Sequence, residues 1–235
     1  MSKTLNIGVL QADSVVEQFQ AAHGDYPVMF ERILSRDGVN IEHYNVELGR
    51  YPNDLDECDG YVITGSKKSV YDNEPWIHQL EAFVLQLHKA KKKLVGICFG
   101  HQLVAQALGG KTEAASAGWG VGIHASKVLR QEYFMSPPLE EFGLLVSHKD
   151  QVTQLPHGAE LIATNDFCPN AAFLIDDHIL TFQGHPEFTP DYATDLMRWR
   201  EDILGPEKYS RGIASLNEPL DRLQVSDWII KFFHE

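Results

Sequence analysis

The sequence predicts an α/β fold with a mostly parallel central sheet and helices on both of its faces. Three observations point to this class. Short apolar runs alternate with helical patterns through the first half of the chain, as they do in right-handed βαβ units. Apolar residues make up 43% of the 235 residues, which is typical of a protein with a real core. No linker, repeat or low-complexity stretch divides the chain, so we expect one domain over residues 1–235.

The first half of the chain is expected to supply the parallel strands. Its apolar runs predict strands over residues 5–10, 41–46, 61–63 and 94–97. Helices are expected from Tyr26-Pro27 to Asp37-Gly38, over residues 74–90, and from residue 99 to Gly109-Gly110. Glycine ends the last of these because it accepts the left-handed conformation of a helix cap.

The second half is richer in strand patterns. Strands are predicted over residues 121–129, 142–146, 160–163, 171–175 and 179–182. Asp176-Asp177 indicates a hairpin turn between the last two. Thr189-Pro190 opens a helix, with threonine as its N-cap and proline in its first turn. A final helix is expected over residues 219–233, so that a core over about residues 5–200 carries a C-terminal helical extension over about residues 201–235.

Composition excludes several classes of protein. A net charge of −13 disfavours nucleic acid as a partner, because phosphates would be repelled. No apolar run approaches the ~18 residues of a membrane span, and the N-terminus lacks the apolar region of a signal peptide. Three cysteines argue against a disulfide framework. Together these features predict a reducing, cytoplasmic location.

Cys98 occupies the centre of the most informative stretch. An apolar strand runs into Gly96-x-Cys98-x-Gly100, and a helix begins directly afterwards. A nucleophile with glycine two residues to either side is typical of a nucleophile elbow, which presents its side chain exposed at the top of a sheet. The helix N-terminus favours the thiolate, and the Phe99 N–H would point at an oxyanion. Taken alone, this motif leaves open that Cys98 is a buried structural cysteine.

A candidate base lies further along the chain. His185 and Glu187 follow the strand predicted over residues 179–182. An imidazole there can reach a thiolate while a carboxylate holds its other nitrogen. Zinc deaminases share His-x-Glu but need a following Pro-Cys-x-x-Cys, which is absent, so neither a metal nor another cofactor is predicted. Gly65, Cys98 and His185 all follow predicted strands, where ligands bind in such sheets.

Gly-Ile-Cys-Phe-Gly-His-Gln at residues 96–102 and His-Pro-Glu at residues 185–187 together resemble the class I (triad) glutamine amidotransferase family. The likeness is to its free-standing branch, similar to the amidotransferase domain of GMP synthase and to γ-glutamyl peptidases. Further matching stretches lie at residues 63–66, 71–77, 147–150 and 168–173, and the resemblance covers roughly residues 5–200. It implies a flavodoxin-like arrangement of the sheet.

The resemblance also implies roles for individual residues. Cys98, His185 and Glu187 would form the catalytic triad. Backbone at Gly65 and Phe99 would stabilise the oxyanion, and Gln102 would help to hold the glutamyl end of the substrate. Ser147 and His148 either line the same pocket or belong to a polar loop. We expect His101 to point away from Cys98 on the helix, assign no role to Cys58 or Cys168, and leave open whether Trp119 is a pocket lip or loop packing.

Two functions follow as expectations. The first is a free-standing enzyme that hydrolyses a γ-glutamyl amide, either glutamine or another small γ-glutamyl compound, through a γ-glutamyl thioester. The alternative is a glutaminase subunit that delivers ammonia to a separate synthetase chain, such as a GMP synthase-type partner. The residues past 200 are too few for an ATP-binding synthetase domain, and no complete glycine-rich phosphate loop is found. A glyoxalase or chaperone-like relative is disfavoured by His-Pro-Glu.

Overall fold

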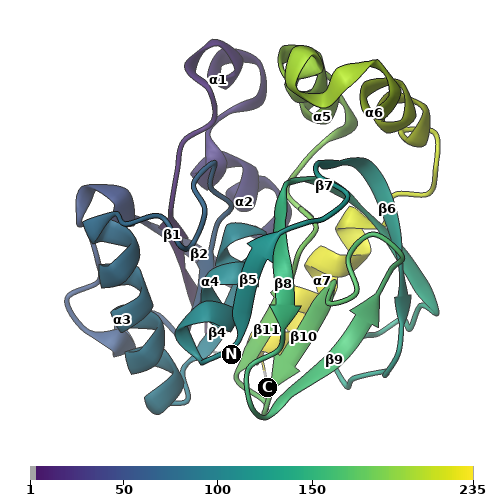
Figure 1. Cartoon of the computed structure of the whole chain (residues 1–235). Coiled ribbons are helices and arrows are strands. Elements are labelled where there is room, and N and C mark those ends of the chain that lie inside the picture. The colour runs from purple at the N-terminus through teal and green to yellow at the C-terminus, as the bar shows by residue number, and fades with distance from the viewer. Residues whose placement is uncertain (1–3, 235) are drawn as a thin grey trace.

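The computed structural model describes residues 4–234, and nine of its strands form one sheet in the order β2-β1-β3-β4-β11-β10-β9-β6-β7 (Figure 1). Residues 1–3 and 235, the ends of the predicted domain, lie outside this range. The first five strands in this order pair in parallel. They are β2 (Val39–Asn45), β1 (Leu5–Gln11), β3 (Gly60–Ile63), β4 (Lys93–Ile97) and β11 (Ile179–Phe182).

The remaining strands pair antiparallel. They are β10 (Ala172–Ile175), β9 (Ala159–Thr164), β6 (Gly120–Val128) and β7 (Glu141–His148). The predicted hairpin joins β10 to β11 through Asp176, whose φ is 48°. Two short strands, β5 (Lys111–Ala114) and β8 (Asp150–Gln154), form a separate antiparallel pair. The predicted α/β class is confirmed, with the parallel strands next to an antiparallel edge.

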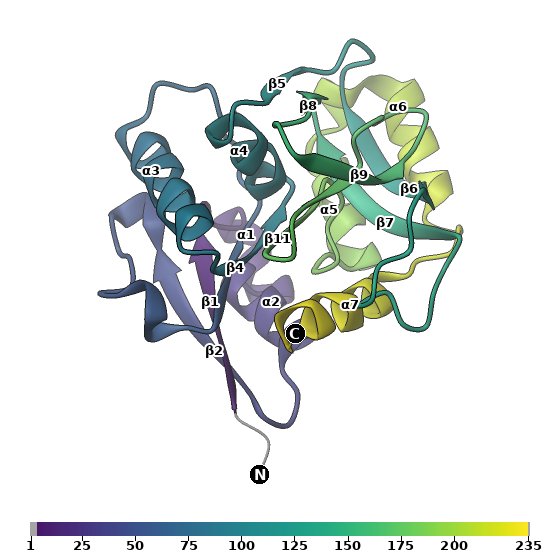
Figure 2. The ribbon, with the colours of Figure 1, turned by 90° about the horizontal axis from the view of Figure 1, so that it is seen from below.

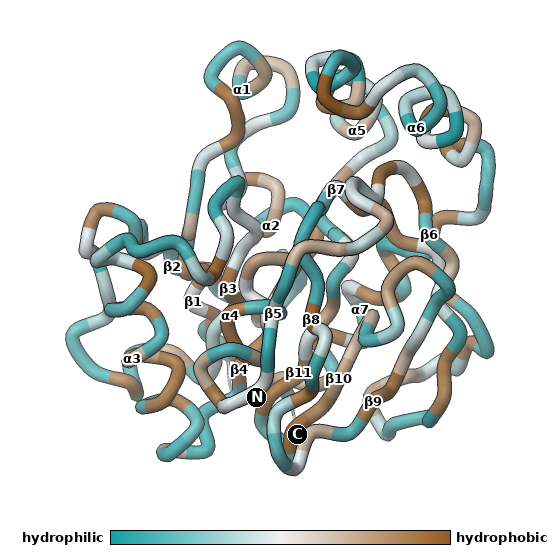
Figure 3. Tube along the Cα trace, viewed as in Figure 1, coloured by the Kyte–Doolittle hydropathy of each residue, from teal (hydrophilic) through white to brown (hydrophobic). Residues whose placement is uncertain are grey.

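Helices cover both faces of the sheet (Figure 2). On one face lie α2 (Tyr26–Leu34) and α7 (Arg222–His234), and on the other lie α3 (Pro75–Lys89) and α4 (Phe99–Ala107). Asp25 caps α2 by accepting from the Tyr26 N–H. The final helix belongs to the core, because Trp228 is fully buried with its ring edge-on to Phe142. Hydrophobic stretches accordingly concentrate on the central strands in Figure 3.

A third group of helices stands beyond the carboxyl ends of the parallel strands (Figure 1). It consists of α1 (Glu17–His23), α5 (Pro190–Trp199) and α6 (Glu201–Ser215). The Thr189 side chain caps α5 as predicted, by accepting from the Tyr192 N–H. His23 of α1 lies 2.8 Å from Asp195 of α5, so these two helices contact each other. Among the helices of residues 4–234, none has the length and apolar character that crossing a bilayer requires.

The helix α6 lies within the predicted C-terminal helical extension, and a break at Gly205, with φ of 73° and followed by Pro206, interrupts it. Three other elements were not predicted, and each lacks a strong periodic signal. The helix α1 is seven residues long and contributes no buried residue. The strands β5 and β8 are short and largely polar. Short polar elements of this kind form because neighbouring elements hold them, which hydrophobic periodicity does not report.

Candidate functional site

Cys98 lies in a sharp turn between β4 and α4. Its φ of 52° and ψ of −100° are rare for a residue with a side chain, as expected of a strained elbow. The turn requires glycine beside it, because a Cβ on Gly100 would lie 2.6 Å from the Ile63 carbonyl oxygen. The Cys98 N–H donates to the Phe182 carbonyl at 2.9 Å, which ties the turn to β11. Cys98 is 5% exposed, so it is more buried than the elbow motif suggests.

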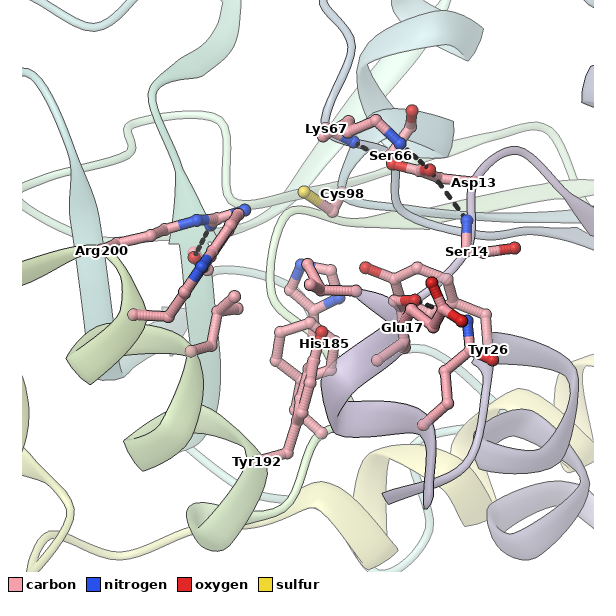
Figure 4. A pocket seen from close by; sticks show the side chains of 17 residues that line it. Asp13, Ser14, Glu17, Tyr26, Ser66, Lys67, Cys98, His185, Tyr192 and Arg200 are labelled. Atoms are coloured by element: carbon pink, nitrogen blue, oxygen red, sulfur yellow. Dashed lines mark hydrogen bonds and ion pairs between the residues drawn. The ribbon is translucent and has the colours of Figure 1, made fainter. Parts of the chain in front are cut away.

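His185 is held rigidly after the end of β11. Its Nδ1 lies 2.7 Å from Glu187 Oε1, and its ring stacks on Phe188 with centroids 3.8 Å apart and planes 10° apart. Its backbone N–H donates to the Leu145 carbonyl at 2.8 Å. Both His185 and Glu187 are buried. Since Glu187 occupies Nδ1, the other ring nitrogen is left for the Cys98 thiol, and both side chains line the same cavity (Figure 4).

The surroundings of His185 favour its charged form. Burial by itself would lower the pKa of the imidazole, but the Glu187 carboxylate and the Cys98 sulfur outweigh it and raise the pKa to about 10. The amide nitrogen of Gln183 also points at Cys98 Sγ, at 3.5 Å. The site is therefore built for an imidazolium beside a sulfur that accepts hydrogen bonds. Gln183 lies two residues before His185, and the sequence did not predict a role for it.

The segment around Gly65 closes the site from the neighbouring strand. A Cβ on Gly65 would lie 2.8 Å from His185 Cε1, so only glycine lets the segment approach the imidazole this closely. The segment is anchored to the end of β1, where Asp13 accepts from the Lys67 N–H at 2.8 Å and Ala12 donates to Thr64 Oγ1 at 3.0 Å. Asp13 was not predicted, since nothing in the sequence links it to the loop after β3.

Gln102, Ser147 and His148 line a small recess of about 40 Å³ beside Cys98. Gln102 Nε2 donates to the Asp150 carbonyl at 2.7 Å and to Gln183 Oε1 at 3.0 Å. Ser147 Oγ accepts from Arg200 Nη1 at 2.7 Å. Burial lowers the pKa of His148 to about 3, so this imidazole is neutral. The side chains of Gln102, Ser147 and His148 thus lie together beside the cysteine, and Phe99 follows Cys98 directly as the first residue of α4.

A larger cavity of about 490 Å³ adjoins the recess and shares Cys98, Ser147 and Arg200 with it (Figure 4). Residues from the end of β1, from α1 and from α5 line it together with His185. Labelled among them in Figure 4 are Asp13, Ser14, Glu17, Tyr26, Ser66, Lys67, Tyr192 and Arg200. Burial raises the pKa of Tyr192 to about 12, so its hydroxyl stays protonated and can donate a hydrogen bond. Helices α1 and α5 of the group beyond the sheet therefore form one wall of the cavity.

The remaining candidates fall outside or at the edge of the site. His101 Nδ1 lies 2.9 Å from Thr181 Oγ1 and the ring packs against Phe173, away from the cavity. Cys168 is buried, which raises its pKa to about 12. Trp119 lines the small recess, so it is a pocket wall. Within residues 4–234, no three His, Cys, Asp or Glu side chains are grouped as a metal site would need.

Comparison with known proteins matches residues 25–198 to the family model described as glutamine amidotransferase class-I. The chain is 30% identical over 196 residues to γ-glutamyl peptidase 2 of Arabidopsis thaliana, which covers 80% of this chain and 78% of that protein. It is 31% identical over 189 residues to a glutamine-hydrolysing GMP synthase of Thermomicrobium roseum, covering 77% of this chain and 34% of the synthase. A glutamine amidotransferase structure from Thermotoga maritima shares the fold, with a TM-score of 0.80 over 99% of both chains at 17% identity.

Proposed function

The chain belongs to the class-I glutamine amidotransferase family, and on that premise we propose that it hydrolyses the γ-glutamyl amide bond of a small molecule through a Cys98–His185–Glu187 triad. One observation carries the proposal. The imidazole of His185 is fixed between Glu187 and Phe188 beside a cysteine held in a strained turn, and both face a cavity large enough for a small molecule. The likeness to a γ-glutamyl peptidase supports the choice of bond.

The first half-reaction would proceed as follows. The Cys98 thiolate attacks the γ-carbonyl carbon, and the carbonyl electrons move onto the oxygen. The Phe99 N–H lies at the start of α4, where helix N–H groups lack intrahelical partners, and it stabilises the oxyanion together with the backbone at Gly65. The tetrahedral intermediate then expels the amine, which takes its proton from His185. A γ-glutamyl thioester remains on Cys98.

The second half-reaction returns the enzyme to its starting state. His185, now neutral, accepts a proton from water as the water attacks the thioester carbonyl. Collapse of this intermediate expels the Cys98 thiolate and releases glutamate. Glu187 orients the imidazole and stabilises its charged form in both steps. In this proposal Gln102, Ser147 and His148 hold the glutamyl end, since they line the recess beside Cys98. No cofactor takes part, and the reaction needs a free thiol, as a cytoplasmic location would preserve.

A second function has support from the likeness to GMP synthase. In this second function, the chain would hydrolyse glutamine as a glutaminase and pass the ammonia to a separate synthetase chain. The deciding experiment incubates the purified chain, without ATP, with glutamine, a γ-glutamyl anilide and glutathione, and measures glutamate by mass spectrometry. We expect at least one compound to be hydrolysed. Hydrolysis of glutamine only after a synthetase is added would replace this proposal with the subunit function.

Replacing Gly65 by alanine should slow hydrolysis by about 100-fold, because the new Cβ displaces the His185 ring from a contact of 2.8 Å. Steady-state kinetics with the best substrate of the panel measures this. Gly158→Ala is the matched control: its φ is +80° and no atom lies within 4 Å of the added Cβ. That variant should melt at a lower temperature yet keep its activity. A wild-type rate for Gly65→Ala would contradict the placement of this segment against the catalytic imidazole.

The pH dependence of kcat/KM should reflect the raised pKa of His185. The imidazolium that protonates the leaving amine persists through neutral pH and is lost as the pH rises through about 10. Activity should therefore fall on the alkaline side near pH 10. Glu187→Gln removes an anion that raises this pKa, so the alkaline limb should move to lower pH. An alkaline limb that stays in place in Glu187→Gln would show that the carboxylate does not set the charge of His185.

A further inference from the structure

Arg200 is a half-buried cation at the junction of α5 and α6, and it lines the same cavity as Cys98. Its guanidinium carbon lies 5.0 Å from the Trp119 ring centroid and 5.7 Å from that of Trp199. One nitrogen, Nη1, donates to Ser147 Oγ. Among residues 4–234, no carboxylate lies within 4.0 Å of this guanidinium, whereas the exposed Arg198 two residues earlier contacts Asp195.

The guanidinium of Arg200 is partly removed from water, but no carboxylate of the described residues pairs with it in return. Burial lowers the pKa of Arg200, although a guanidinium stays charged at any physiological pH. Arginine carries five N–H donors in a planar fork that matches a carboxylate, and one donor is used here. The two indole rings, at 5.0 Å and 5.7 Å, restrain the guanidinium by cation–π contacts. The arrangement is preorganised for an incoming anion.

The two halves of a γ-glutamyl substrate would occupy the two adjoining spaces that Cys98 lines. His185, the proposed proton donor to the leaving amine, lines the larger cavity and is absent from the small recess. Gln102 and His148 line the recess but not the larger cavity. Arg200 borders both spaces, and Trp199 beside it lines the larger one. A cavity of about 490 Å³ is of the size that holds ordinary small ligands, far more than released ammonia needs.

We propose that Arg200 determines specificity by binding the carboxylate of the leaving amine, so that the preferred substrates are γ-glutamyl amino acids and short γ-glutamyl peptides. This inference rests on the proposed function and narrows its substrate class. The glutamyl half also carries a carboxylate, so the test must separate the two. A pair of substrates that differ only in the leaving carboxylate does so: γ-glutamylglycine and γ-glutamylglycinamide.

The wild-type chain should hydrolyse γ-glutamylglycine with a kcat/KM at least about tenfold higher than that for γ-glutamylglycinamide, as expected for one charge-assisted pair. Arg200→Gln should lose this preference, mainly through a higher KM for γ-glutamylglycine, and should slow the hydrolysis of γ-glutamylglycinamide far less. Arg200→Lys should keep part of the preference, since it retains the charge. Arg198→Gln, with an exposed side chain, should behave as wild type. Melting temperatures check that each variant folds.

Several outcomes would overturn the inference. Equal wild-type rates on the two substrates would do so, and so would an equal loss on both in Arg200→Gln, because that pattern assigns Arg200 to the glutamyl carboxylate. Calorimetry with the Cys98→Ala variant separates recognition from turnover. The Cys98→Ala variant could bind γ-glutamylglycine more tightly than γ-glutamylglycinamide while the wild type hydrolyses neither compound. That result would support the role of Arg200 and refute the proposed hydrolysis. Equal binding of the two would refute the role of Arg200.

Discussion

The Cys98→Ala variant should fold as the wild type does and hydrolyse γ-glutamyl compounds about 10⁵-fold more slowly or worse, because loss of a covalent nucleophile removes the whole catalytic route. One sulfur atom is lost from a nearly buried position, so we expect a small decrease in the free energy of unfolding. Kinetics by mass spectrometry and thermal unfolding measure the two effects. The matched control is Cys168→Ala, which removes a buried thiol outside both cavities.

Chemical labelling gives an independent measure of the same assignment. A glutamine-like diazo-ketone should label Cys98 and leave Cys58 and Cys168 unmodified. Both of the latter are buried, and burial raises their pKa, so they present little thiolate. Peptide mapping locates the label. Modification chiefly at Cys58 or Cys168, or an active Cys98→Ala variant, would remove the nucleophile assignment.

Much of the site was predictable because its residues follow strands directly. Gly65, Cys98 and His185 each come after a short apolar run, and parallel strands bring their carboxyl ends to one edge. Glycine at residues 96 and 100 predicted the sharp turn, and the contacts that a side chain would make there explain it. The glycine pattern around Cys98, and the rule that parallel strands bring their carboxyl ends to one edge of the sheet, were enough to predict these positions.

The walls of the cavity were not predictable in the same way. Arg200 reaches the site because α5 ends above the sheet, and its neighbours Trp119 and Ser147 come from distant segments. Asp13 contacts Lys67 across two strands that are 49 residues apart at their nearest ends, Gln11 and Gly60. Such contacts depend on how elements pack, and hydrophobic periodicity carries no information about them. The residues proposed to determine substrate specificity are therefore known only from the structure, and the sequence did not predict them.

His185→Ala should lower kcat by about 10³-fold or more, whereas Glu187→Gln should lower it by about 10- to 100-fold. In the proposed mechanism the imidazole transfers a proton in both half-reactions, while the carboxylate, 2.7 Å from the ring, only orients and stabilises it. Some orientation survives without Glu187, because the ring still stacks on Phe188 and its backbone is still bonded to Leu145. Single-turnover kinetics separates attack on the amide from hydrolysis of the thioester.

The double variant gives the sharpest form of this prediction. Because Glu187 acts only through His185, adding Glu187→Gln to His185→Ala should change the rate little further, and the two effects should be far from additive. Asp191→Asn, in the first turn of α5, removes a control carboxylate and should leave the rates of both half-reactions unchanged. Additive losses in the double variant would mean that Glu187 acts on the substrate by itself, and a wild-type rate for His185→Ala would mean that the triad is wrong.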